Sequence, residues 1–337
     1  MFNAAIVGCG RIASTFDDDP KRKSSIATHA GAYDFFPETK LIAAADIDSA
    51  KLKEFGKKWG VAKLYTDYQD MLAKEKIDIL SVCTWNPTHF QICRKAISCG
   101  VKAIFCEKPI TEKLSDADRL VELCEENGVI LAVNHSRRWD KMHQQIKDFV
   151  EQGNLGKIQG VSGYYTAGIL NTGIHMIDLL RFFFGDVAWV SGCFDGKASV
   201  ADPSADACLY FKQGFLVTLQ GFDVTNYLIF EIDIYGAKGR LRIENSGFEA
   251  SFYSMIGHPK FSGYKCLGER QKMFNGGLQD TLINAIDDLV FCLKKGNKPK
   301  SSAEDGRAAL EIISAIYESG RDKNGAKVLL PLKKQDV

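Results

Sequence analysis

The sequence has no surplus of charge of either sign. Its 43 lysines and arginines balance 42 aspartates and glutamates, so the formal net charge is +1. Nucleic acids and anionic membrane surfaces bind strongly basic proteins, so neither is expected as a partner. Apolar runs are short as well: the longest candidate, residues 176–190, is interrupted by Asp178, Arg181 and Asp186. Because a membrane-spanning helix needs about 18 consecutive apolar residues, no such helix is expected.

Paired cysteine motifs are missing too. The chain has 10 cysteines, but none stand in C-x-x-C pairs or at zinc-type spacing, so we expect no disulfide framework and no metal site. Cys9, Cys83 and Cys106 fall inside apolar runs, where cysteine behaves as a small hydrophobic residue. This usage fits the reducing environment of the cytoplasm. The N-terminal apolar run has no basic residues before it, so we interpret it as a strand rather than a signal peptide.

Apolar runs and helical patterns alternate along the first third of the chain. This alternation is typical of βαβ units and of a parallel, doubly wound sheet whose strands are buried on both faces. The five runs are 4–7, 41–45, 77–83, 101–106 and 129–133.

Strand signals separated by glycine-containing turns dominate after about residue 135. They favour a mostly antiparallel sheet with helices on one face. A helix near 172–184 is expected among them, capped by Asn171 or Thr172, with Ile174, Ile177 and Leu180 as its buried stripe. With 337 residues, two domains are the default.

A glycine turn follows the first apolar run directly. Gly8 and Gly10 stand in the pattern Gly-x-Gly-x-x-Ala, with Arg11 and Ile12 between the second glycine and Ala13. Such glycines allow a tight turn and the close approach of the backbone to a pyrophosphate. The pattern therefore predicts a dinucleotide site, and a tight turn without a ligand is the alternative.

An acidic residue, Asp46, ends the second apolar run. A carboxylate there can accept hydrogen bonds from both ribose hydroxyls and repels a 2′-phosphate, so we predict NAD(H) over NADP(H), with a helix cap as the alternative role. Asp46 lies further from the glycine turn than the roughly 20 residues that are usual. The polar segment 14–25 accounts for the surplus, and we interpret it as a loop inserted before a helix at 27–36. Its basic run 21–23 is either solvated or a lid over a phosphorylated ligand.

Three further motifs follow later in the chain. They are Thr84-Trp85-Asn86-Pro87-Thr88-His89, Glu107-Lys108-Pro109 and Gly173-Ile174-His175-Met176-Ile177-Asp178. In this order, after the glycine turn and Asp46, they resemble the glucose-fructose oxidoreductase/inositol dehydrogenase/MocA family over nearly the whole chain. The resemblance implies a Rossmann domain with a doubly wound parallel sheet at 1–135, and an α+β domain with a large, mostly antiparallel open sheet at 136–337. It also implies NAD at the carboxyl ends of the strands, a sugar-like substrate between the domains, and a homodimer or homotetramer formed through the open sheet.

The resemblance gives roles to several residues of these motifs. It makes Lys108 the residue that hydrogen-bonds the reacting hydroxyl and stabilises its developing negative charge, and its bond to Pro109 is often cis in this family. It makes His175 the general base, with an ordinary pKa near 6.5 that suits proton transfer near neutral pH. Enzymes of the inositol type usually carry aspartate four residues before this histidine, whereas this chain has Asn171. We therefore expect Asn171 to be a neutral helper in a sugar or nucleotide-sugar dehydrogenase.

The resemblance also implies roles for other residues, and for some of them a structural role is the alternative. Arg138 and Tyr164 are expected to contact the substrate beside Lys108, Asn171 and His175. A surface salt bridge is the alternative for Arg138, and a helix cap is the alternative for one cofactor residue, His89. The residues expected at the cofactor are Gly8, Gly10, Arg11, Ile12, Asp46, Thr84, Asn86, His89, Glu107 and Lys108.

Two other functions remain open. One is a hydrolase that uses bound NAD in a transient oxidation to cleave a glycoside. The other is a non-catalytic regulator that binds the cofactor without turnover, which the presence of both Lys108 and His175 disfavours.

Overall fold

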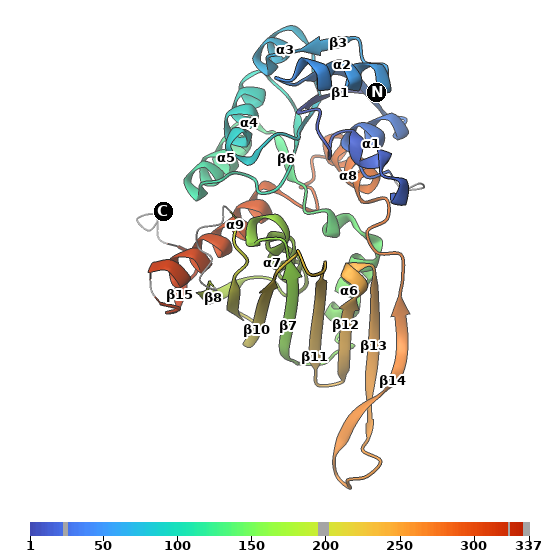
Figure 1. Cartoon of the computed structure of the whole chain (residues 1–337), viewed down its shortest axis with the longest axis vertical. Coiled ribbons are helices and arrows are strands. Elements are labelled where there is room, and N and C mark those ends of the chain that lie inside the picture. The colour runs from blue at the N-terminus through green and yellow to red at the C-terminus, as the bar shows by residue number, and fades with distance from the viewer. Residues whose placement is uncertain (23–25, 195–201, 323, 333–337) are drawn as a thin grey trace. The chain divides into compact units, whose positions relative to one another are not determined.

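The computed structural model describes residues 1–22, 26–194, 202–322 and 324–332, and the chain divides into two compact units. The first comprises Met1–Trp139 and Asp280–Ala308, and the second comprises Asp140–Gln279 and the chain from Ala309 on. The first unit includes two stretches outside its range expected from the sequence, residues 136–139 and 280–308. The second stretch contains helix α8 (Thr281–Lys295), which joins the apolar core of the first unit (Figure 1). The basic run 21–23 lies partly outside the described residues, and its role as a lid stays a prediction.

A parallel sheet with strand order β3-β2-β1-β4-β5-β6 forms the first unit. The order reverses between β1 and β4, which is where open α/β sheets bind ligands, beyond the carboxyl ends of their strands. The doubly wound parallel sheet expected from the sequence is thus confirmed. Its strands are β1 (Phe2–Val7), β2 (Thr39–Ala45), β3 (Lys63–Tyr65), β4 (Ile79–Val82), β5 (Ala103–Cys106) and β6 (Ile130–Val133). The helices besides α8 are α1 (His29–Phe35), α2 (Ser49–Trp59), α3 (Tyr68–Lys74), α4 (His89–Ser98) and α5 (Leu114–Asn127).

Burial explains which of these strands the sequence reveals. Every residue of β4 and β5 is buried, so both appear as continuous apolar runs. β3 has only three residues at the edge of the sheet, and none of them is fully buried. It therefore gives no apolar run, and the pattern predicts five strands where the sheet has six.

The second unit is built on a sheet with order β14-β13-β12-β11-β7-β10-β9-β8-β15 (Figure 1). In the described part of the chain β7 and β10 pair in parallel and the other neighbours are antiparallel, which confirms the mostly antiparallel sheet. Its strands are β7 (Ile158–Thr166), β8 (Val187–Cys193), β9 (Asp206–Phe211), β10 (Phe215–Phe222), β11 (Phe230–Gly236), β12 (Gly239–Glu244), β13 (Glu249–Gly257), β14 (Lys265–Phe274) and β15 (Val328–Leu329). Its helices are α6 (Lys141–Glu151), α7 (Ile174–Phe184) and α9 (Ala303–Tyr317), which begins in the first unit.

Helix α7 packs on one face of this sheet. Ile174, Ile177 and Leu180 are each 0% exposed, which confirms the predicted stripe. Met176 lies against β7, since a Cβ atom on Gly163 would be 3.2 Å from its sulfur. Among the described residues, no helix is long and apolar enough to cross a membrane, and no group of three or more His, Cys, Asp or Glu side chains could hold a metal ion.

Candidate active site

The glycine turn lies directly after β1. Gly8 has a φ of +90°, and a Cβ atom there would lie 2.7 Å from the carbonyl oxygen of Cys83, so this position accepts only glycine. At Gly10 a Cβ atom would meet no heavy atom within 4 Å, so the space beside the turn is open. Arg11 is exposed and Ile12 is half-buried. The turn therefore leaves room for the close approach of a pyrophosphate to its backbone.

The inserted residues separate the glycine turn from helix α1 along the chain, but backbone hydrogen bonds connect the two. At the start of α1, the backbone N–H groups of His29 and Ala30 donate to the carbonyls of Ile12 (3.2 Å) and Ala13 (3.0 Å). Carbonyl groups at the end of the glycine turn thus accept from N–H groups in the first turn of α1, whose cap is Thr28. Within the insertion lie the short 3-10 helices η1 (Thr15–Asp18) and η2 (Pro20–Arg22).

Asp46 follows β2 and faces the glycine turn. Its Oδ2 accepts a hydrogen bond from the backbone N–H of Cys9 (2.6 Å), and its Oδ1 accepts one from the backbone N–H of Asp48 (2.8 Å). Asp48 caps α2 with its own carboxylate, so the alternative that Asp46 is the helix cap is wrong. A carboxylate offers about four acceptor positions, so Asp46 can still accept hydrogen bonds from ribose hydroxyls.

Lys108 follows the end of β5, the strand next to β4 in the sheet. Its peptide bond to Pro109 is cis, as the resemblance implies, and its side chain is half-buried. Because the carboxyl ends of parallel strands meet at one edge of a sheet, Lys108 and the glycine turn lie at the same edge.

Glu107, the residue before this lysine, lies between two hydrogen-bond donors. Its Oε1 is 2.9 Å from Nε2 of His29 and 2.6 Å from Nδ2 of Asn134. Burial raises the pKa of Glu107, but the hydrogen bond and charge of His29, the amide of Asn134 and the Lys108 ammonium together hold that pKa below its ordinary value. Glu107 is therefore a fixed negative charge at this edge of the sheet.

His29 is a fully buried residue of α1 that carries no sequence motif of its own. Its Nδ1 lies 2.9 Å from the hydroxyl of Ser81, which lies 2.8 Å from the hydroxyl of Tyr33. The ring of Phe105 packs against the imidazole with 4.5 Å between the centroids. One feature of the sequence could have pointed to His29: if the inserted segment 14–25 is left out, this histidine lies shortly after the glycine turn.

Asn134 follows β6 and is 4% exposed. Its Nδ2 donates to Glu107, whereas its Oδ1 is buried and has no hydrogen-bond partner among the described residues. A buried carbonyl oxygen without a partner costs about 1–3 kcal/mol. A donor from outside the described residues is therefore expected at this atom.

The segment after β4 contains three residues expected at the cofactor. Thr84 and Asn86 are half-buried at the edge of the sheet. His89 is fully buried, and its ring nitrogens lie 2.9 Å from the carbonyl oxygen of Pro109 and 3.1 Å from that of Thr84. Its ring therefore connects the segment after β4 with the segment after β5 through these two contacts. The cap position of α4 is Thr88, so the alternative that His89 caps this helix is wrong.

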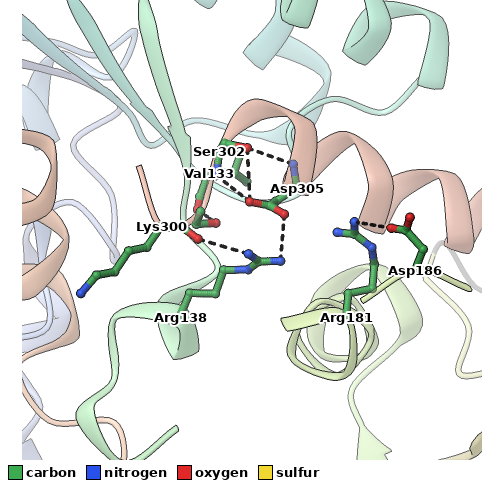
Figure 2. Close-up of polar contacts among 8 residues, drawn as sticks. Val133, Arg138, Arg181, Asp186, Lys300, Ser302 and Asp305 are labelled. Atoms are coloured by element: carbon green, nitrogen blue, oxygen red, sulfur yellow. Dashed lines mark hydrogen bonds and ion pairs between the residues drawn. The ribbon is translucent and has the colours of Figure 1, made fainter. Parts of the chain in front are cut away.

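Arg138 lies in the short helix η4 (Ser136–Trp139) and is 6% exposed. Figure 2 shows its guanidinium between the carboxylate of Asp305 (3.0 Å) and the carbonyl oxygen of Lys300 (3.1 Å). The alternative of a surface salt bridge is wrong, because the arginine is buried. These contacts join the segment after β6 to the start of α9, and a substrate contact of Arg138 stays a prediction.

A π-helical turn, Ile169–Gly173, precedes α7 in the second unit. The carboxylate of Asp202 accepts hydrogen bonds from the backbone N–H groups of Leu170 (2.8 Å) and Asn171 (2.9 Å). Gly168 lies against this carboxylate, and a Cβ atom at that position would collide with it. Asp202 therefore fixes the turn that carries Asn171, and turns of this kind are frequent at functional sites.

The two predicted residues of this region lie on either side of the helix start. Asn171 is exposed in the π-helical turn, and His175 is half-buried in the first turn of α7. The cap of α7 is Gly173, without a side-chain hydrogen bond, so the predicted cap by Asn171 or Thr172 is wrong.

Tyr164 lies on β7, where successive side chains point to opposite faces of the sheet. Tyr165 faces α7, since a Cβ atom on Gly173 would lie 3.0 Å from its ring. Tyr164 therefore faces the other side, where it stacks on Phe222 with 6.3 Å between the centroids. Helix α7, which carries His175, covers the opposite face of the sheet, and the substrate contact of Tyr164 stays a prediction.

Comparisons with known proteins agree with this arrangement. The model of the GFO/IDH/MocA oxidoreductase family, NAD-binding Rossmann fold, matches residues 2–135, and the model of its C-terminal alpha/beta domain matches residues 164–328. A D-apiose dehydrogenase of Rhizobium rhizogenes is 31% identical over 83% of this chain and 87% of its own. A myo-inositol 2-dehydrogenase of Thermotoga maritima is 26% identical over 96% of this chain and 97% of its own. The structure of the WlbA dehydrogenase from Bordetella pertussis, in complex with NADH and UDP-GlcNAcA, shares the fold with a TM-score of 0.78 at 22% identity, over 98% of this chain and 99% of that one.

Proposed function

Because this chain belongs to the GFO/IDH/MocA family of oxidoreductases with an NAD-binding Rossmann fold, we propose that it oxidises a ring hydroxyl of a sugar, nucleotide sugar or cyclic polyol. D-apiose and myo-inositol stand in the names of two relatives, and UDP-GlcNAcA is bound in a structural neighbour. All three are polyhydroxylated molecules. They support the substrate class and leave the individual substrate open.

The residues present fit NAD as the cofactor. The open space at Gly10 would receive the pyrophosphate, and Asp46 would accept hydrogen bonds from the ribose. The buried carbonyl oxygen of Asn134 would accept a donor that the described chain does not supply. We expect Thr84 and Asn86 to line the same edge of the sheet. When bound, NAD supplies the acceptor for the hydride.

Two side chains carry the proposed chemistry. His175 takes the proton of the hydroxyl at a ring nitrogen, and the Lys108 ammonium donates a hydrogen bond to the oxygen as it becomes negative. The exposed amide of Asn171 orients the substrate without taking up a proton. The observation that carries the proposal is the position of Lys108 at the same edge of the sheet as the glycine turn. Holding the reactants in register can remove ~7–11 kcal/mol of the barrier.

The test is a screen for NADH formation by the purified protein and NAD. The probes are myo-inositol, D-apiose, free hexoses, UDP-sugars and chromogenic glycosides. We expect NADH to accumulate with at least one sugar or polyol. Cleavage of a glycoside without net NADH would instead identify an NAD-using hydrolase, and tight NADH binding with no turnover of any probe would favour a regulator.

We also propose that copies of the chain associate through the open face of the second sheet. This face carries Tyr164 and the ion pairs of Arg240 with Asp233 (2.5 Å) and Arg242 with Glu231 (2.9 Å). Light scattering should then give two or four times the chain mass of 37.3 kDa. A mass of one chain at micromolar concentration would exclude this assembly.

A further inference from the structure

Four polar side chains form one connected chain of contacts in the first unit. It runs from Tyr33 through Ser81 and His29 to Glu107, with successive polar atoms 2.8, 2.9 and 2.9 Å apart. Tyr33 is 1% exposed, and Ser81 and His29 are 0% exposed, whereas the side chain of Glu107 is 12% exposed. The chain of contacts therefore begins in the core and ends beside Lys108, at the edge of the sheet.

The orientation of His29 follows from the charge of its partner. An ionised carboxylate only accepts hydrogen bonds, so Nε2 of His29 carries the proton that it shares with Glu107. The hydroxyl of Ser81 holds Nδ1 at the other edge of the ring, and Phe105 packs on its face. With both nitrogens engaged, the imidazole has one orientation and presents a fixed donor to Glu107.

We propose that His29 is a positioning residue: it holds Glu107 as an oriented carboxylate whose negative charge keeps the neighbouring Lys108 ammonium protonated. The inference rests on the proposed role of Lys108 in stabilising the substrate oxygen. A lysine that substrate and cofactor enclose loses contact with water, and this loss favours the neutral amine. A fixed negative charge one residue away opposes that effect. The interaction is reciprocal, since the Lys108 ammonium also helps to lower the pKa of Glu107.

Two other titratable groups near Glu107 are Cys106, the last residue of β5, and Cys83, which follows the neighbouring strand β4. Burial raises the pKa of the Cys83 and Cys106 thiols, and the charge of Glu107 raises it further. At the far end, burial raises the pKa of Tyr33. All three groups therefore stay neutral over the range in which enzymes work. Among the groups that lower the pKa of Glu107, Lys108 is the one whose ammonium the proposed chemistry uses.

The protonation state of Lys108 can be measured in the free protein, without any substrate. The free protein is labelled with trace acetic anhydride over a series of pH values between about 5 and 10. Mass spectrometry gives the labelling rate of Lys108 relative to Lys51, whose side chain is 59% exposed. Because only the neutral amine reacts, the relative rate reports the fraction of Lys108 that has lost its proton.

Three variants give different expected profiles. Glu107→Gln removes the negative charge at every pH, so the labelling of Lys108 should rise about tenfold throughout, which corresponds to a pKa shift of about one unit. In His29→Leu the buried Glu107 loses a donor and its pKa rises. Labelling should then be about tenfold higher at low pH and should return to the wild-type rate above the new pKa of Glu107. His29→Gln keeps an N–H donor and should restore the wild-type profile.

His143→Leu is the matched control. His143 also contacts a buried carboxylate, with its Nδ1 2.6 Å from Oδ2 of Asp140, but this pair lies in the second unit. The control should leave the labelling of Lys108 unchanged. Thermal melting and NADH titration check that each variant is folded. His29→Asn, whose shorter amide cannot reach Glu107, replaces His29→Leu if that protein does not fold.

A folded His29→Leu protein whose Lys108 profile matches the wild type at every pH would overturn the inference. A tenfold rise in the His143→Leu control would overturn it as well, because the effect would then not be specific to His29. Failure of the proposed function is a separate result. If Lys108→Met still forms NADH at the wild-type rate, Lys108 does not act in the reaction, whatever the labelling shows about its protonation.

Discussion

Nε2 of His29 lies 2.9 Å from Oε1 of Glu107, although 78 residues separate them in the sequence. The contact joins the first helix of the parallel unit to the end of β5, one residue before Lys108. A carboxylate held in this way stays ionised at a place where burial alone would favour the neutral acid. The residue proposed to stabilise the reacting oxygen thus stands next to a built-in negative charge.

Glu107→Gln should weaken the acid dependence of stability. The pKa of Glu107 is lowered in the folded chain, against about 4.3 in an unfolded one. A lowered pKa contributes stability above the unfolded pKa, and this contribution is lost as the pH falls through the folded pKa. Melting temperatures measured from about pH 7 to pH 3 should therefore fall more steeply below about pH 4.3 for the wild type than for the variant. If the melting temperatures of the wild type and the variant fall in parallel with pH, the pKa of Glu107 is not lowered in the folded chain.

Gly8→Ala should abolish cofactor binding and lower stability. The positive φ of Gly8 costs an alanine about 1–2 kcal/mol, and its Cβ atom would lie 2.7 Å from the carbonyl oxygen of Cys83. Gly60→Ala is the control, since Gly60 also has a positive φ, of +65°, but no atom within 4 Å of a Cβ. Both should lower the melting temperature, and only Gly8→Ala should lose NADH binding in a fluorescence titration. NADH binding by a folded Gly8→Ala protein would exclude the turn as the cradle.

Asp46 should set the choice between the two nicotinamide cofactors. A 2′-phosphate about 4 Å from its carboxylate is repelled by about 4 kcal/mol at an effective dielectric of 20, so kcat/KM should favour NAD over NADP by at least about 100-fold. Asp46→Ser should narrow this ratio. Asp48→Ala removes the cap of α2, which costs about 1 kcal/mol, and should leave the ratio unchanged. Equal efficiency of the wild type with both cofactors would show that Asp46 does not face the ribose.

Asp202→Ala should loosen the turn that carries Asn171. The change removes the acceptor of two backbone N–H groups and should destabilise the protein by about 1–3 kcal/mol. Turnover should fall, whereas NADH affinity should stay at the wild-type level. Asp206→Ala is the control, because Asp206 also accepts from a backbone N–H, that of Gly221, but on the sheet. If the two variants turn over the substrate at equal rates, the turn that carries Asn171 does not contribute to catalysis.

The sequence predicts those elements whose burial leaves a periodic or continuous pattern. β4 and β5 are buried throughout and are apparent as apolar runs, and the stripe of α7 is apparent for the same reason. β14 has mostly exposed side chains and β13 has only two buried residues, so neither shows an apolar run. The place of α8 in the first unit depends on contacts between distant parts of the chain, which no local pattern records.

The residues of the candidate site also divide into those that the sequence predicts and those that it does not. Gly8, Asp46 and Lys108 stand in motifs because each lies within two residues of the end of a strand, and strand ends can be predicted from the sequence. His29 was not predicted, since its partners come from other strands and the insertion separates it from the glycine turn. Asp202 was not predicted either, because it acts on the backbone of a turn about 30 residues earlier.

The most direct test of the proposed function compares Lys108→Met with the wild type, using the best sugar or polyol from the screen. Lys102→Met, at the other end of β5 and 63% exposed, is the control. Loss of one donor to a developing oxyanion costs about 10²–10³-fold in kcat, so NADH formation should fall by that factor in Lys108→Met alone, with NADH affinity unchanged. Wild-type turnover by Lys108→Met would contradict the assignment of Lys108 to the reacting centre.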